Sequence, residues 1–404
     1  MADISGRTAA MEVPGLREST NLITPPLPFM KRMKYSIIAF LWYRVLLKGM
    51  LYYGEAKKYF VPPGEKEPDL VKTYPVRKSL TIRIFFPPSY KPSTTTTTSS
   101  PQPPKLPTLL TIHGGGFTVG EPHDNDSWNR AFAQRHNTLV IALDYSKSPS
   151  GPFPTAIHDL EALIHCILAD RTLPLDPARV AIAGFSAGGN FALAVTQLPS
   201  LRGRIRAAVP LYPLVVQAPT AAEGEAKAAR RRYKPALGGF RGKAEDFLLP
   251  MMRLFNWSYL AAGQRCDDPL LSPWYAPRET LPKDIFFVAC ELDMLAHETW
   301  RMACKLSGRR VPGLGEKVGS QEVVGKGRLI TEGDERFAFE ETMEDGSRYR
   351  WLLVPDTIHG FDQDGIEGLA GDPVFMEDAR IKTAKTIDLI GEWLLSGPLK
   401  GDSE

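Results

Sequence analysis

The chain has 404 residues, and its 49 Lys and Arg residues nearly balance its 46 Asp and Glu residues, which gives a formal net charge of +3. So small a charge excludes a general attraction to nucleic acids or other polyanions as the basis of function. The length is sufficient for a large α/β core with insertions. The four cysteines lack the spacing of a metal site, and nothing in the sequence requires an oxidising compartment.

The N-terminal segment, residues 1–60, contains the first apolar stretch. Residues 1–30 are polar and lack the pattern of a cleavable signal peptide, so we expect an intracellular protein, cytoplasmic or associated with an internal membrane, that is not secreted. Residues 35–53 are long enough to span a bilayer, but Arg44 and Lys48 would each cost about 2.5–3.5 kcal/mol near its centre. Because the two cations share one helix face, we expect a helix that lies on the protein as a lid or makes peripheral contact with a membrane surface.

Residues 61–404 are expected to form one α/β catalytic domain. Apolar strands alternate with helical segments, which is the pattern of a mostly parallel sheet covered by helices on both faces. A Thr, Ser and Pro-rich run at 90–108 is expected to be an exposed loop. The predicted strands are 79–87, 108–113, 138–144, 179–184, 206–212, 284–290 and 350–354. The predicted helices are 126–136, 154–169, 187–198, 294–306 and 374–395.

A glycine-rich motif, HGGGF, follows the strand predicted at 108–113. Consecutive glycines let backbone N–H groups turn inward without a Cβ in the way, and such amides can bind an oxyanion. An ordinary turn is the alternative, but a serine motif follows further along the chain. We therefore assign Gly114 and Gly115 as oxyanion donors, and expect His113 to form a structural hydrogen bond rather than act as a base.

The string GFSAG at residues 184–188 lies between a predicted strand and a predicted helix. Small residues two before and two after the serine let a strand turn sharply into a helix, with the serine exposed at the apex. Ser186 is therefore the predicted nucleophile. The amide of Ala187, at the start of the helix, is the third predicted oxyanion donor.

Two stretches break the alternation of strands and helices. Residues 217–262 begin with Ala, Glu, Lys and Arg and then become more apolar, so we expect an inserted helical subdomain that serves as a lid. Residues 307–347 are rich in Gly, Lys and acidic residues, with a turn signal at 344–347. We expect this excursion to end in a β-hairpin.

A serine nucleophile needs a base, and the base needs an acid that orients it. His359 follows the last predicted strand, where the carboxyl ends of a parallel sheet present ligand-facing groups, and it is the predicted base. Asp293 stands at the corresponding end of the preceding strand and is favoured as the acid over its neighbour Glu291. The order serine, acid, histidine is that of α/β-hydrolases.

Five motifs together resemble the hormone-sensitive lipase-like family, over about residues 105–395. The resemblance implies an α/β-hydrolase core, with a lid built from N-terminal helices and an inserted segment, that acts on carboxylic esters without a cofactor or metal. Family members usually prefer short or medium acyl chains. The motifs are HGGGF at 113–117, GFSAGGN at 184–190, DPLLSP at 268–273, ELDML at 291–295 and HGF at 359–361.

Two features depart from the family pattern. Phe185 stands where most members carry Asp or Thr, so an apolar contact is expected in place of a carboxylate network. The 307–347 excursion lengthens the interval between Asp293 and His359, and we expect it to reshape one wall of the pocket. Substrate size is therefore not inferred from the family. The GFSAGGN form is similar to esterase-like proteins of filamentous fungi, some of them linked to natural-product pathways.

The sequence thus predicts a serine carboxylesterase that hydrolyses a small-molecule ester, natural-product or lipid-like, through an acyl-enzyme. The same triad also serves acyltransferases, lyases and cyclases, which differ in whether water reaches the acyl-enzyme. A non-catalytic receptor on this fold, like the gibberellin receptor, is disfavoured because the base His359 is retained.

Overall fold

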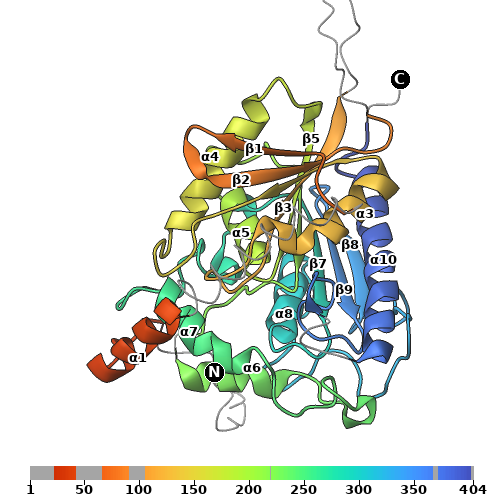
Figure 1. The fold of residues 1–404 in the computed structure, drawn as a ribbon. Coiled ribbons are helices and arrows are strands. Elements are labelled where there is room, and N and C mark those ends of the chain that lie inside the picture. The colour runs from red at the N-terminus through yellow and green to blue at the C-terminus, as the bar shows by residue number, and fades with distance from the viewer. Residues whose placement is uncertain (1–21, 42–65, 91–104, 219, 367–371, 402–404) are drawn as a thin grey trace, which may run out of the picture.

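The computed structural model describes residues 22–41, 66–90, 105–218, 220–366 and 372–401. Within these ranges nine strands form one sheet, in the order β1-β2-β4-β3-β5-β6-β7-β9-β8 (Figure 1). The central pairs from β4 to β9 are parallel, whereas β1, β2 and β8 pair antiparallel with their neighbours. The strands are β1 (Leu70–Tyr74), β2 (Arg77–Phe85), β3 (Leu106–Ile112), β4 (Leu139–Leu143), β5 (Leu175–Phe185), β6 (Ala207–Leu211), β7 (Asp284–Cys290), β8 (Ala338–Thr342) and β9 (Arg348–Val354).

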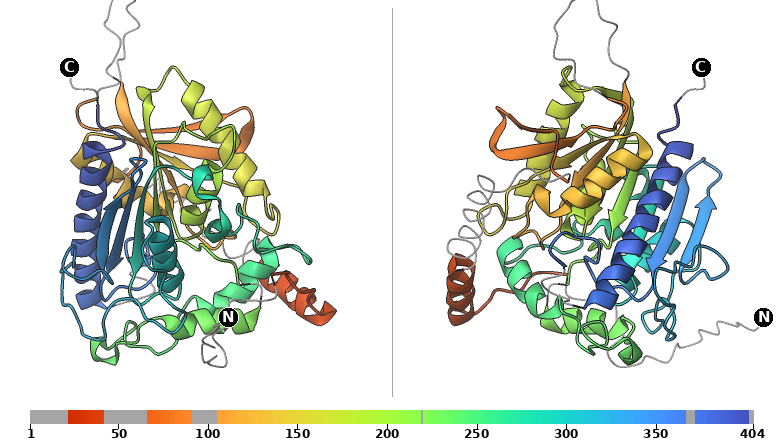
Figure 2. Two further views of the ribbon diagram at one scale, coloured as in Figure 1. Left: turned by 180° about the vertical axis from the view of Figure 1, so that it is seen from behind. Right: turned by 45° about the vertical axis from the view of Figure 1, so that its right-hand side comes forward.

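Helices cover both faces of the sheet. Helices α4, α5 and α8 lie on one face, and α3 and α10 lie side by side on the other (Figures 1 and 2). Each face encloses its own cluster of buried apolar side chains. The α-helices are α1 (Phe29–Phe40), α3 (Asp126–His136), α4 (Thr155–Ala169), α5 (Ala187–Thr196), α6 (Ala221–Arg230), α7 (Leu249–Tyr259), α8 (Ala296–Leu306) and α10 (Pro373–Ser396). Short 3₁₀ helices are η2 (Pro122–Asn125), η3 (Pro235–Leu237), η4 (Pro273–Tyr275) and η5 (Arg278–Thr280).

The predicted α/β fold class is confirmed, and the burial of the central strands explains why the sequence pattern predicted it. Every residue of β3, β4 and β6 is buried, because helices cover both faces of the central parallel strands. The edge strand β1 was not predicted. Its five residues LVKTY are mostly exposed, so the hydrophobic alternation that reveals a strand is weak there.

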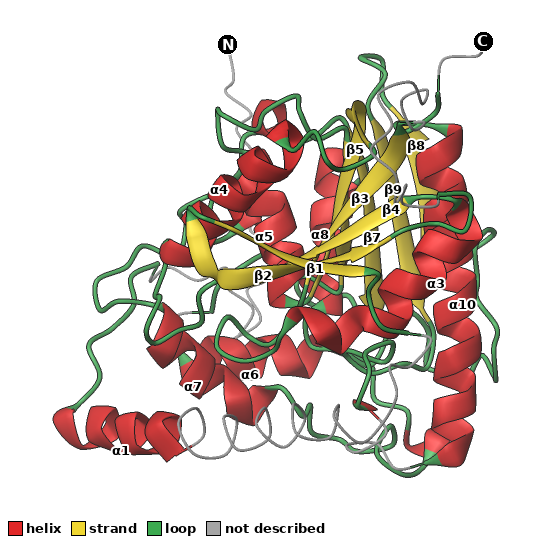
Figure 3. Ribbon diagram, turned by 45° about the horizontal axis from the view of Figure 1, so that its top comes forward, coloured by secondary structure: helices red, strands yellow, loops and turns green. Residues whose placement is uncertain are grey.

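Both irregular stretches reach the carboxyl ends of the sheet, where Asp246 contacts Met294 and Ser320 contacts Glu291. Residues 217–262 contain α6, η3 and α7. We call them the inserted segment. Helices α6 and α7 lie below the strands in Figure 1 and below β1 and β2 in Figure 3. The excursion 307–347 ends in β8, which pairs with β9 in an antiparallel hairpin that matches Ala338 with Leu352. The predicted hairpin is therefore confirmed.

At the N-terminus, α1 packs against α7 of the inserted segment through the rings of Tyr35 and Trp257, whose centroids are 5.8 Å apart. The helix begins before the predicted stretch 35–53, and residues 42–53 lie outside the described residues, as do 91–104 of the predicted loop. In the part of the chain that the structure describes, no helix is long and apolar enough to cross a bilayer.

Candidate active site

The turn between β5 and α5 places Ser186 at the carboxyl end of the central strand. Ser186 has φ 56° and ψ −114°, a conformation that non-glycine residues adopt only when the surroundings enforce it. A Cβ on Gly184 would lie 2.1 Å from the carbonyl oxygen of Gly188. A Cβ on Gly188 would lie 2.1 Å from the carbonyl oxygen of Ile112 on β3. The turn therefore needs glycine at both positions.

The structure brings together the three residues predicted as nucleophile, base and acid. Ser186 Oγ donates a hydrogen bond to His359 Nε2 at 2.7 Å. On the other side of the ring, His359 Nδ1 donates to Asp293 Oδ2 at 2.7 Å. The second oxygen of Asp293 accepts from the amide of Leu295 at 2.9 Å, which fixes the carboxylate. The three side chains lie at the ends of β5, β7 and β9 in one continuous chain of hydrogen bonds.

The charge around His359 favours its protonated form. Burial by itself lowers the pKa of the imidazole, but the negative charge of Asp293 and its hydrogen bond act against burial. The carboxylates of Asp246 and Asp362 add to the effect, and together they raise the pKa of His359 above its ordinary value. An imidazole in this setting readily takes up the proton that a serine must lose.

Asp246 was not predicted from the sequence. It belongs to the inserted segment, is 4% exposed, and accepts a hydrogen bond from the amide of Met294 at 2.9 Å, next to Asp293. Burial, followed by the charge of Asp293, raises the pKa of Asp246 to about 6. Its sequence context, KAEDF, resembles a solvated polar run, so no local pattern marks it as part of the site.

The predicted oxyanion loop runs directly behind Ser186. A Cβ on Gly114 would lie 3.1 Å from the carbonyl oxygen of Phe185 and 3.3 Å from Ser186 Cβ. Gly115 has φ 112°, which is open to glycine. Among the described residues, no backbone carbonyl accepts from the amide of Gly114 or Gly115. The contacts of Gly114 place this loop directly beside Ser186, and Ala187 is the first residue of α5.

His113 holds the oxyanion loop from behind. Its Nδ1 donates to the carbonyl oxygen of Gly114 at 2.7 Å, and the hydroxyl of Tyr145 donates to the same oxygen at 3.1 Å. The two rings stack with centroids 4.4 Å apart. Burial, assisted by Lys147, lowers the pKa of His113 below its ordinary value. The structural hydrogen bond predicted for His113 is therefore confirmed.

Phe185 makes the apolar contact expected in place of a carboxylate network. Its ring is fully buried and meets the edge of Trp128 with centroids 5.2 Å apart. Tyr212, whose ring lies 6.3 Å away, packs in turn against His359 at 4.8 Å. The tyrosine hydroxyl donates to Asp362 at 2.5 Å. A series of aromatic rings thus connects Phe185, next to Ser186, with His359.

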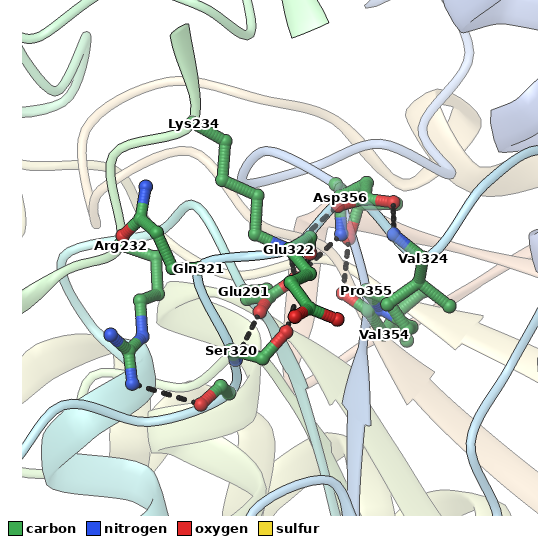
Figure 4. A network of polar contacts seen from close by, with 12 residues as sticks. Arg232, Lys234, Glu291, Ser320, Gln321, Glu322, Val324, Val354, Pro355 and Asp356 are labelled. Carbon is green, nitrogen blue, oxygen red and sulfur yellow. Dashed lines mark hydrogen bonds and ion pairs between the residues drawn. The ribbon is translucent and has the colours of Figure 1, made fainter. Parts of the chain in front are cut away.

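Glu291, the rival acid, does not contact the imidazole. Its carboxylate lies in a buried network with Lys234 and Asp356 (Figure 4).

Two phenylalanines of the inserted segment lie close to the site. The ring of Phe247 lies 6.4 Å from that of His359, and Phe255 packs against Gly116 of the oxyanion loop. No group of three or more His, Cys, Asp or Glu side chains in the described ranges is arranged to hold a metal ion.

Comparison with known proteins places this geometry in a family. Residues 109–319, more than half of the chain, match a family described by the α/β-hydrolase fold. A carboxylesterase of Mycobacterium tuberculosis is 31% identical over 120 residues, which cover 30% of this chain and 34% of that protein. An acetyl-hydrolase of Streptomyces hygroscopicus is 33% identical over 190 residues, covering 46% and 56%. The matches thus span from about a third to just over half of these relatives' lengths.

Solved structures show the same fold over nearly the whole chain. An esterase of Pyrobaculum calidifontis superimposes with a TM-score of 0.57 and 20% identity, covering 92% of this chain and 99% of that one. A fungal esterase from Rhizomucor miehei gives a TM-score of 0.57 and 21% identity, covering 93% and 99%. The chain belongs to the α/β-hydrolases of the hormone-sensitive lipase-like family.

Proposed function

We propose that this chain is a serine carboxylesterase that works through an acyl-enzyme. The observation that carries the proposal is the pair of 2.7 Å hydrogen bonds that connect Ser186, His359 and Asp293 in series. The names of the relatives, carboxylesterase and acetyl-hydrolase, agree with it.

The reaction begins when His359 Nε2 takes the proton of Ser186 as Oγ forms a bond to the ester carbonyl carbon. The amides of Gly114, Gly115 and Ala187 hold the negative oxygen that results. His359 returns its proton to the leaving alcohol as the ester C–O bond breaks. In the second half, His359 takes a proton from water as the water oxygen bonds to the acyl carbon. His359 then gives this proton to Ser186 Oγ as the bond between Oγ and the acyl carbon breaks, which releases the acid and restores the serine hydroxyl. Asp293 keeps Nδ1 protonated throughout.

Covalent labelling tests the assignment of Ser186. We expect a fluorophosphonate probe to modify the chain stoichiometrically at Ser186, as read by peptide mass spectrometry, and the Ser186→Ala variant to lose hydrolysis of p-nitrophenyl acetate. A folded protein that stays unlabelled, or a Ser186→Ala variant that still hydrolyses the ester at the original rate, contradicts the proposal.

The proposed substrate is a natural-product or lipid-like ester. Phe247 and Phe255 bring apolar surface to the catalytic residues from the inserted segment, for which we propose the role of a lid. A series of acyl and aryl esters will show whether kcat/KM rises with apolar size. Product analysis with alcohols and amines present separates hydrolysis from acyl transfer, and free acid as the sole product supports hydrolysis.

We also propose peripheral contact with an anionic membrane through α1. Its large apolar side chains are exposed on the face turned away from the buried Ala39, and the helix has cations but no acidic residue. The exposed apolar residues are Phe29, Met30, Met33, Ile37, Ile38 and Leu41, and the cations are Lys31, Arg32 and Lys34.

Vesicle flotation tests this contact. We expect the protein to float with phosphatidylserine-containing vesicles, less with phosphatidylcholine alone, and to lose flotation in the Phe29→Ser/Ile37→Ser variant. Equal recovery of the wild type and the variant contradicts a role for α1.

A further inference from the structure

A buried lysine of the inserted segment joins the two loops that carry the acid and the base. The side chain of Lys234, between α6 and η3, is 0% exposed. Its Nζ donates to Glu291 Oε2 at 2.6 Å, to Asp356 Oδ1 at 2.7 Å and to the carbonyl oxygen of Glu322 at 2.7 Å (Figure 4). An ammonium group has three N–H bonds, so all of its donors are used.

The two carboxylates are held by further donors. Glu291 Oε2 also accepts from the amide of Asp356 at 2.9 Å, and its Oε1 accepts from the amide of Ser320 at 2.9 Å. Asp356 Oδ2 accepts from the amides of Val324 and Gly325 at 2.8 and 3.1 Å. Three parts of the chain therefore converge on the network: the inserted segment, the 307–347 excursion and the ends of β7 and β9.

The position of the network relative to the catalytic residues suggests its role. Glu291 precedes Asp293 by two residues after β7, and Asp356 precedes His359 by three residues after β9. One backbone hydrogen bond, from Leu292 to Thr357 at 2.9 Å, joins the same two loops directly. The ammonium is the charge that allows their two carboxylates to lie within 2.7 Å of a common atom.

We propose that Lys234 is a positioning residue, which sets the relative placement of the loops that carry Asp293 and His359. The proposal rests on the proposed esterase function. Without the ammonium, two buried carboxylates face each other, and their repulsion separates the loops. The 2.7 Å hydrogen bond between His359 and Asp293 then lengthens, which misorients the base. Lys234 touches neither substrate nor reacting atoms, so it acts only through these loops.

The Lys234→Met variant keeps an unbranched side chain, shorter only by the terminal ammonium nitrogen, and removes its charge. We expect kcat for p-nitrophenyl acetate to fall by about tenfold or more, while KM stays within about twofold, because the binding surface is untouched and the base is misplaced. The far-downfield proton resonance of His359 Nδ1–H should weaken in the same variant. All measurements are made well below the thermal midpoint of each variant.

Lys227→Met is the matched control. Lys227 is also a buried lysine of the inserted segment, paired with Glu298 and the carbonyl oxygen of Val216, and neither partner lies on the loops of Asp293 or His359. We expect both variants to lower the thermal midpoint, but only Lys234→Met to lower kcat. The proposal is overturned if the thermal midpoint of Lys234→Met falls as that of Lys227→Met does, while kcat and the His359 resonance stay at their wild-type values.

A charge-balanced variant keeps the test decisive if Lys234→Met does not fold. Lys234→Met/Asp356→Asn removes one carboxylate together with the ammonium, and the new amide can donate to Glu291. We expect it to fold, with kcat several-fold below the wild type because the bridge is gone. Wild-type kcat in this variant overturns the proposal. Failure of the wild type itself to label at Ser186 would instead contradict the proposed function.

Discussion

The parallel core and the inserted segment contribute to the site by different physical means. The core fixes Ser186 by steric contact, because Gly184 and Gly188 leave room for backbone atoms where any side chain would collide. The inserted segment is attached to the carboxyl ends of the sheet by buried charges. Lys234 joins Glu291 and Asp356, and Arg241 pairs with Asp378 of α10 at 3.0 Å and also contacts the backbone of Asp356.

The difference has a consequence for how tightly the proposed lid is held. A lid attached by apolar contacts alone can slide, whereas a buried ion pair is strongly destabilised when one partner leaves. Residues 231–246 therefore belong to the fixed part of the site. Within the described part of the inserted segment, α7 is attached differently, mainly by aromatic contacts: Phe255 packs against the oxyanion loop, Trp257 against α1, and Tyr259 stacks on Phe117 with centroids 4.0 Å apart. Opening motions are expected at α7 rather than at Lys234.

The largest expected effect comes from replacing a glycine of the core, and a glycine of the inserted segment serves as its control. Gly188→Ala would place a Cβ 2.1 Å from the carbonyl oxygen of Ile112, so we expect loss of soluble, fluorophosphonate-reactive protein. Gly224→Ala, in α6, would place its Cβ 3.5 Å from a methyl group of Leu249, an ordinary contact. Because alanine favours helix by about 1 kcal/mol, Gly224→Ala should raise the thermal midpoint slightly. A similar loss of soluble, reactive protein in both variants would contradict the steric explanation for the glycines around Ser186.

A second, smaller effect concerns Phe185. Phe185→Asp would introduce a residue common in the family, but it would place a carboxylate at a fully buried position against the ring of Trp128. Loss of aromatic packing typically costs about 3–5 kcal/mol, and we expect the free energy of unfolding to fall by at least this amount. The loss should lessen at acid pH, because burial raises the carboxyl pKa and the neutral form is tolerated. Phe185→Leu, the control, should cost less than about 1.5 kcal/mol. Urea unfolding at two pH values measures both.

The sequence predicted the residues of the parallel core better than those of the inserted segment. Ser186 was predicted from its motif between a strand and a helix, and Asp293 and His359 were predicted because they follow buried strands closely. The carboxyl ends of such parallel strands meet at one edge of the sheet. Lys234 and Asp246 were missed. They lie in polar stretches whose composition indicates solvent exposure, and only the folded chain shows which of those charges are buried against a partner. Local periodicity carries no information about an ion pair between residues 57 positions apart, such as Lys234 and Glu291.

The smallest expected effect tests whether the inserted segment also tunes the base. Asp246 is one of the carboxylates that raise the pKa of His359, and only the neutral imidazole can accept the serine proton. The acid limb of kcat/KM should therefore lie above the ordinary imidazole value of about 6.5 in the wild type. Removing this charge in Asp246→Asn lowers the pKa of His359, so the limb should move to lower pH with little change in the plateau. Asp176→Asn removes the same charge beside Arg179, at the amino end of β5, and should leave the limb in place. An unmoved limb in Asp246→Asn would mean that Asp293 and Asp362 determine the protonation of His359 without Asp246, and that the inserted segment acts on His359 only through the geometry that Lys234 maintains.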